Sequence, residues 1–150
     1  MQTNATSPDI TEAACSLKLQ LDHFGCELAA TSVNSETSVG WIYYHATSIY
    51  LSGLFDYILS GTGCIISLTG AEVKFHTVGL LSRTKIALRE CSVSSLLLLL
   101  PLRIAGNRCN TPTEFREVVD QLTEIERVFA ITSAFKRELQ QIWHTRAAYS

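Results

Sequence analysis

The stretch Ser94–Cys109, SSLLLLLPLRIAGNRC, decides the fold of this chain. Its five successive leucines, Leu96–Leu100, would make a helix apolar on every side, whereas a membrane-spanning helix needs about 20 apolar residues. Because the run is too short to cross a bilayer, we expect a helix from about Val93 to Gly106 that is buried at the centre of the protein. Pro101 would remove a backbone hydrogen bond inside that helix, which predicts a kink.

Further helices are expected on both sides of this central one. Asp9 is the expected N-cap of the first of them, and Thr69 and Thr111 each begin a T-x-x-E capping box. Apolar residues at helical spacing predict helices over 9–31, 39–59, 70–90, 112–127 and 131–148. Because no segment alternates as a strand does, we predict an all-α fold of about six helices, packed as an irregular bundle around the leucine-rich, proline-kinked helix.

The chain length and the polar segments define the expected domain organisation. A chain of 150 residues suits one domain with a single core. Residues 1–8 are polar and end at Pro8, so we expect a disordered lead followed by a single helical domain over 9–150. The small polar residues between Thr31 and Val39 predict a loop.

The charge balance disfavours a nucleic-acid binder. Twelve Lys and Arg residues stand against fourteen acidic ones, for a formal net charge of −2, and no basic stripe is visible. Only 17% of the residues are charged, against about a quarter in an average soluble domain. We therefore expect no autonomous DNA binding, no membrane insertion, and a surface that binds protein partners.

The cysteines indicate an intracellular protein. Five of them form no C-x-x-C pair, and the odd number argues against a disulfide framework, so reduced and mostly buried thiols are expected. The first 20 residues lack the basic and apolar regions of a secretory signal. The cysteines are Cys15, Cys26, Cys64, Cys91 and Cys109.

No catalytic, cofactor-binding or metal-ligating residues are predicted. The four histidines lie on different helices without the i, i+4 spacing of a helical zinc site, and no nucleophile elbow or phosphate-binding glycine loop is present. His45 and His76 lie in apolar helices, where neutral imidazoles hydrogen-bonded across a helix pair are the expected arrangement. The alternative is a small helical enzyme of secondary metabolism that uses these two histidines and Tyr44.

The charged residues have structural interpretations as well. Arg103 follows the predicted kink and is expected to pair with an acidic residue or to cap carbonyls in the interior. The helix over 112–127 has an apolar face and an opposite face of mixed charge, which we interpret as a solvated surface. Its acidic residues are Glu114, Glu117, Asp120, Glu124 and Glu126.

Five segments follow one another in an order that carries a family resemblance. They are WIYYHATSIYLSGLFDY from Trp41, a helix containing His76, the leucine-rich segment ending in PLRIAG, the capped helix that begins after Thr111, and a last segment from Phe135 to Trp143. Over residues 39–147, this order resembles the C-terminal part of the regulatory domain of fungal zinc-cluster transcription factors. That family binds DNA through a basic six-cysteine cluster holding two zinc ions, and this chain has no such element, so no DNA-binding or zinc residue is carried over.

The resemblance implies a non-catalytic, transcription-regulatory helical domain without a cofactor, as a fragment or truncated form of such a factor. Its expected partners are the transcription machinery or the remainder of a longer factor, and a small-molecule effector could bias its packing. Nuclear localisation is expected, with the cytoplasm as the alternative for the isolated chain. A helical structural or interaction protein is the alternative function.

We predict that the chain does not bind duplex DNA in a sequence-specific way at physiological salt, because its net charge is negative and it lacks the zinc cluster. An electrophoretic mobility shift with a pool of random duplexes tests this, with an intact zinc-cluster protein as the positive control. A saturable shift that depends on sequence would contradict the prediction.

Overall fold

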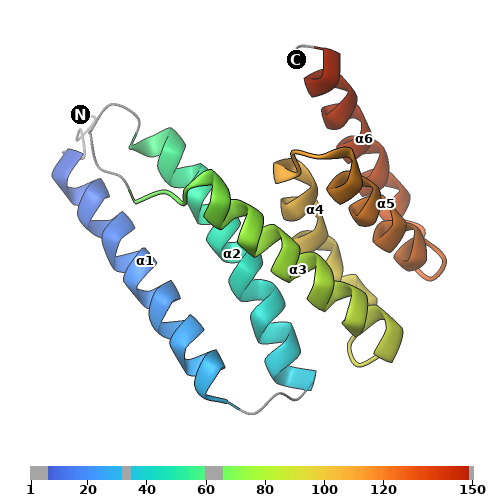
Figure 1. The fold of residues 1–150 in the computed structure, drawn as a ribbon, viewed down its shortest axis with the longest axis horizontal. Helices are drawn as coiled ribbons and strands as arrows, with labels where there is room; N and C mark the ends of the chain where they lie inside the picture. Colours follow the sequence, from blue (N-terminus) through green and yellow to red (C-terminus); the bar gives the residue numbers. More distant parts are fainter. Residues whose placement is uncertain (1–6, 32–34, 60–65, 149–150) are drawn as a thin grey trace, which may run out of the picture.

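The computed structural model describes residues 7–31, 35–59 and 66–148, and within these ranges the all-α prediction is confirmed. The described residues form six α-helices and one 3-10 helix, and no strand (Figure 1). The elements are α1 (Ser7–Ala30), α2 (Ser35–Ile58), α3 (Gly70–Glu90), η1 (Ser95–Leu98), α4 (Leu99–Arg108), α5 (Pro112–Glu126) and α6 (Thr132–Ala148).

The starts of α3 and α5 follow the predicted capping boxes. At α3, the Glu72 backbone N–H donates to Thr69 Oγ1 at 3.3 Å, and the Thr69 N–H donates to Glu72 Oε2 at 2.7 Å. At α5, the Glu114 N–H donates to Thr111 Oγ1 at 3.2 Å, and the Thr111 N–H donates to the Glu114 carboxylate at 3.3 Å. Each box satisfies backbone donors that the first helical turn leaves unpaired.

The first two helices begin earlier than predicted. Because α1 starts at Ser7, Asp9 lies in the first turn and is not the N-cap, although its charge still suits the positive end of the helix. Of the predicted disordered lead, Ser7 and Pro8 belong to α1, and residues 1–6 lie outside the described residues. The helix α2 begins at Ser35, so the predicted loop over 31–39 is shorter than expected. Small polar residues and Glu, which indicated a loop, are also common at the start of a helix.

The predicted central position of the leucine-rich segment is confirmed for α4. This helix packs against α2, α3, α5 and α6, and Leu98, Leu102 and Ala105 are fully buried in the main core. A Cβ placed on Gly106 would lie 2.7 Å from a Leu139 methyl carbon, so α6 can approach α4 this closely only because residue 106 has no side chain. The other fully buried large apolar side chains are Ile42, Ile49, Leu80, Leu81, Val118, Leu122, Ile125 and Leu139.

The leucine run is not buried on every side, which corrects the prediction. Leu96, Leu97 and Leu100 keep 46%, 48% and 52% of their surface exposed. The run is divided between η1 and α4, so its side chains point both to the core and to the exterior. None of the helices in the described ranges is both long and apolar enough to cross a membrane.

Pro101 does not kink a helix interior, contrary to prediction. It is the third residue of α4, within the first turn, where an N–H has no intrahelical acceptor. The Leu97 carbonyl, which a residue four positions later would bond in a continuous α-helix, instead accepts a hydrogen bond from the Tyr43 hydroxyl at 2.8 Å. The chain therefore changes from 3-10 to α geometry just before the proline, and α2 supplies the missing donor.

The helices α1, α2 and α3 run alternately up and down beside one another (Figure 1). Apolar contacts among Ala14, Phe55, Leu59 and Ile66 form a second, smaller cluster that holds α1 against α2. Near the other end of this pair, the Tyr44 ring packs against Gly25, where a Cβ would lie 2.7 Å from the ring. Much of α1 remains exposed, because among the helices it packs mainly on α2.

The cysteines are less buried than predicted. Cys15, Cys26 and Cys91 are exposed and free, and Cys109 is the one buried cysteine in the described ranges. Burial raises the pKa of the Cys109 thiol to about 12, and its Sγ contacts the Ala105 carbonyl at 3.2 Å. Cys64 lies outside the described residues.

We predict that Leu98→Ala lowers the free energy of unfolding by about 2–5 kcal/mol, because it removes a fully buried side chain and leaves a cavity. Leu97→Ala is the matched control from the same run, and its half-exposed side chain should cost about 1 kcal/mol or less. Urea denaturation of both variants measures the difference. Equal losses would show that the two leucines are equally buried.

Candidate functional site

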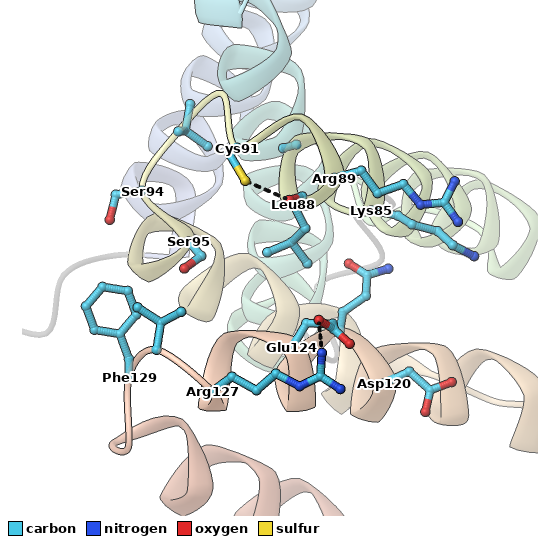
Figure 2. A pocket seen from close by; sticks show the side chains of 14 residues that line it. Lys85, Leu88, Arg89, Cys91, Ser94, Ser95, Asp120, Glu124, Arg127 and Phe129 are labelled. Carbon is cyan, nitrogen blue, oxygen red and sulfur yellow. Dashed lines mark hydrogen bonds and ion pairs between the residues drawn. The ribbon is translucent and has the colours of Figure 1, made fainter.

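A groove of about 740 Å³ lies between the C-terminal half of α3 and that of α5 (Figure 2). The segment that joins α3 to η1 closes one end, together with the turn after α5. That segment begins at Cys91, whose positive φ of 49° ends α3 in a left-handed cap. Two helix walls and two connections therefore build the groove from segments far apart in the sequence.

The floor of the groove is apolar. Leu88 projects from α3 into the space between the two helices, and Phe129 lies at the closed end (Figure 2). Val128, in the turn after α5, is 71% exposed. The remaining apolar lining comes from Ala87 and Val93. Apolar groups collected in an open groove are a common feature of binding sites.

The two helix walls carry opposite charges. Lys85 and Arg89 lie one turn apart on α3, and Asp120 and Glu124 lie one turn apart on α5. Within the described chain, neither Arg89 nor Asp120 has a hydrogen bond or an ion pair. The groove therefore offers one basic and one acidic edge to a partner.

Some of these charges form weak ion pairs. Lys85 Nζ lies 3.4 Å from Glu117 Oε1, and Arg127 Nη1 lies 2.9 Å from Glu124 Oε2. All four side chains are at least a third exposed, so each pair is worth at most about 1 kcal/mol. A bound partner can exchange such pairs at little cost.

Beneath the groove, buried polar contacts hold the two walls together. The Thr84 hydroxyl donates to Gln121 Oε1, and Gln121 Nε2 donates to the Leu81 carbonyl at 2.9 Å. The burial of Gln121 was not predicted from the sequence, because this residue lies within the charged stretch of α5. Gln121 lies three residues after Val118 and four before Ile125, which places it on the buried face of the helix. This spacing is the sequence feature that could have predicted its burial.

The predicted solvated face of α5 forms the acidic wall. Asp120 and Glu124 are exposed, and Glu117 is partly exposed at the edge. The other two acids of this helix have local roles, since Glu114 completes the capping box and Glu126 pairs with Lys136. Sequence patterning found this face, but only the fold brings it opposite α3.

Arg103 does have the predicted acidic partner, but the pair is not in the interior. Its Nε and Nη2 donate to the Glu138 carboxylate at 3.2 and 2.6 Å, which raises the pKa of Arg103. Both side chains are about 40% exposed, so this bidentate ion pair joins α4 to α6 at the surface. It lies outside the groove.

His45 and His76 form the predicted hydrogen bond across a helix pair, with 2.9 Å between their Nδ1 atoms. Both side chains are buried where α2 meets α3, and the rings of Tyr44 and Phe75 lie against His76. A Cβ on Gly79 would lie 2.7 Å from His45 Nε2, so α3 covers that nitrogen closely. The pair thus joins two helices through their buried faces.

The environment keeps both imidazoles neutral. Burial, with smaller contributions from the neighbouring His76 and Arg83, lowers the pKa of His45 to about 4. Burial also lowers the pKa of His76, despite the opposing carboxylates of Glu72 and Asp22. Since one Nδ1 must accept the proton of the other, protonation of both rings would break the bond.

The three residues that the alternative function as an enzyme would use, His45, His76 and Tyr44, lie close together in the structure. The Tyr44 ring lies 5.4 Å from the His45 ring and 5.6 Å from the His76 ring, measured between centroids. The cavity beside Tyr44 and His76 has a volume of about 30 Å³, which is about the volume of one water molecule. His23 and His144 are exposed on other helices and are not part of this cluster.

Other sequence candidates lie apart from the groove or outside the described ranges. Gly61 and Gly63, which follow the predicted helix over 39–59, lie outside the described residues. Within those residues, no group of three or more His, Cys, Asp or Glu side chains is placed to hold a metal ion. Comparison with protein-family models, curated proteins and solved structures finds no match to this chain. Its function must therefore be inferred from its own residues and geometry.

We predict that the stability advantage of the wild type over His45→Asn shrinks by about 3 kcal/mol between pH 7 and pH 4. Because the folded-state pKa of His45 lies below the usual 6.5, the unfolded chain binds the proton more tightly, and stability is lost as the pH falls through this window. Thermal or urea unfolding across the pH range measures the difference.

Leu98→Ala is the control for this measurement. It removes packing without removing a titrating group, so its cost should be the same at every pH. A gap between wild type and His45→Asn that stays constant with pH would show that His45 does not have the lowered pKa.

Proposed function

We propose that this chain is a non-catalytic helical module that regulates transcription through protein contacts made in the groove between α3 and α5. The observation that carries the proposal is the groove itself, with its apolar floor and unpaired charges on opposite walls. Such a surface offers apolar area that a partner can bury and charged groups that can orient the partner, and a specific protein contact uses both.

The module would act by a change of packing. The two walls of the groove come from helices that share the buried Thr84–Gln121 contact, and α3 also carries the His45–His76 bond to α2. A partner, or a small-molecule effector, that prefers one arrangement of these helices shifts the population toward it. The transcriptional role itself is supported by the motif order from Trp41 to Trp143 and by the nuclear function that this resemblance implies.

A structural or interaction protein is the second candidate, and a specific surface favours it. Tyr50 and Leu54 of α2 are exposed beside a hollow of about 290 Å³ that also includes Ile104 of α4. Leu97 and Leu100 add exposed apolar area at the start of α4. Such a face suits permanent packing against another subunit.

The enzyme alternative receives less support from the geometry. His45 and His76 use their Nδ1 atoms to bond each other, and α3 covers the far nitrogen of His45. The adjoining cavity has room for about one water molecule and not for a substrate. These features favour a structural role for the cluster.

We predict that the chain changes reporter output when it is fused to a heterologous DNA-binding domain. Replacing Glu117, Asp120 and Glu124 together by lysine should alter that output, because the substitution reverses the acidic wall of the groove. The helical content should be nearly unchanged, since substitutions on exposed faces usually cost within about 0.5 kcal/mol each.

The matched control replaces Glu12, Glu27 and Asp56 by lysine, which changes the net charge equally at exposed sites away from the groove. It should retain the wild-type output. A fusion that is folded and expressed but gives the output of the bare DNA-binding domain, with or without the lysines, would leave the structural alternative as the better account.

A further inference from the structure

We propose that the groove between α3 and α5 binds an amphipathic helix that carries acidic residues along one edge of its apolar face and basic residues along the other. This inference rests on the proposed function, because it names the partner chemistry of the same site. Charge complementarity on both walls commits the groove to this occupant.

The spacing of the charges matches a helix. Lys85 and Arg89 are separated by four residues on α3, and so are Asp120 and Glu124 on α5, so each pair spans about 6 Å along its helix axis. A partner helix places its own charges at the same interval when they are four residues apart. One acidic pair can then meet α3 while one basic pair meets α5.

The unpaired charged side chains on the two walls support this arrangement. Arg89 and Asp120 have no partner within the described chain, so a partner's charges meet groups that need not give up a bond. Among the residues that the structure describes, Glu124 pairs only with Arg127, whose side chain is 70% exposed. A basic residue of the partner can replace Arg127 at little cost.

The apolar floor supplies the remaining affinity. Leu88 projects into the space between the charged walls, and Phe129 lies at the closed end of the groove, which Val128 also lines. An apolar helix face would cover these side chains. An extended strand would not fit as well, because strand addition requires an open sheet edge, whereas helices form both walls. The helix-in-groove mode is the one that uses a floor and two charged edges together.

Three synthetic peptides test the proposal with the full chain. Each has about 18 residues and the same leucine stripe, and they differ only in their edges: glutamate on one edge and lysine on the other (mixed), lysine on both, or glutamate on both. Fluorescence anisotropy gives the dissociation constants. Because a helix that reverses its direction exchanges its edges, the panel is designed so that the outcome does not depend on the binding orientation.

We expect the wild type to prefer the mixed peptide by about threefold to tenfold over the other two. K85E/R89E makes both walls acidic and should move the preference to the all-lysine edges. D120K/E124K makes both walls basic and should move it to the all-glutamate edges. This exchange of preference is a readout that a loss of stability does not produce.

Matched variants locate the binding site. K74E/R116E and E12K/D56K carry the same changes of net charge at exposed residues outside the groove, and both should keep the wild-type order of preference. Val128→Asp, in the floor, should weaken the mixed peptide at least fivefold, whereas Ile131→Asp should not. These two side chains are 71% and 62% exposed and lie close together in sequence, but only Val128 lines the groove.

The inference is overturned if the wild type binds none of the peptides, binds all three equally, or keeps its preference in the wall variants. Its failure is distinguishable from that of the proposed function. An active reporter fusion without peptide selection would retain the regulatory role but reject this partner chemistry. Peptide selection with an inert fusion would retain the helix-binding groove but reject the role in transcription.

Discussion

The close packing of α4 against four other helices is the constraint on which the rest of the structure depends. Leu98, Leu102 and Ala105 are fully buried there, and Gly106 allows α6 to approach the helix backbone. A cavity at this position would loosen the contacts of α4 with α2, α3, α5 and α6 alike, since it packs against all four. The groove and the histidine pair both depend on helices positioned in this way.

Pro101 determines how the central segment begins. Because a proline has no N–H, the Leu97 carbonyl is left without its helical donor, and the Tyr43 hydroxyl takes that place. The preceding residues adopt 3-10 geometry, and Leu96 and Leu97 remain about half exposed. The Tyr43 hydroxyl, which replaces the missing donor, thus joins α2 to the segment before α4. The half-exposed leucines of that segment add apolar area to the surface.

Buried polar contacts position α3 on two sides. The His45–His76 bond ties its N-terminal half to α2, and the Thr84–Gln121 contact ties its C-terminal half to α5. Such contacts have directional requirements that apolar packing lacks, so they select one rotation of α3 about its axis. That rotation places Lys85 and Arg89 along the groove, opposite the acids of α5.

The sequence by itself determined the all-α class, the approximate extent of the helices and both capping boxes, because each follows from local spacing. It also indicated that His45 and His76 are hydrogen-bonded across a helix pair, whereas the tertiary structure decided that they bond each other. Only the tertiary structure decided which leucines of the central run are buried, where Pro101 lies in its helix, and that Gln121 bonds α3 rather than water. It also brought Lys85 and Arg89 opposite Asp120 and Glu124, residues more than 30 positions apart. The physical reason is that burial and charge opposition depend on how helices rotate against one another, and the periodicity of one helix carries no information about its neighbour's rotation.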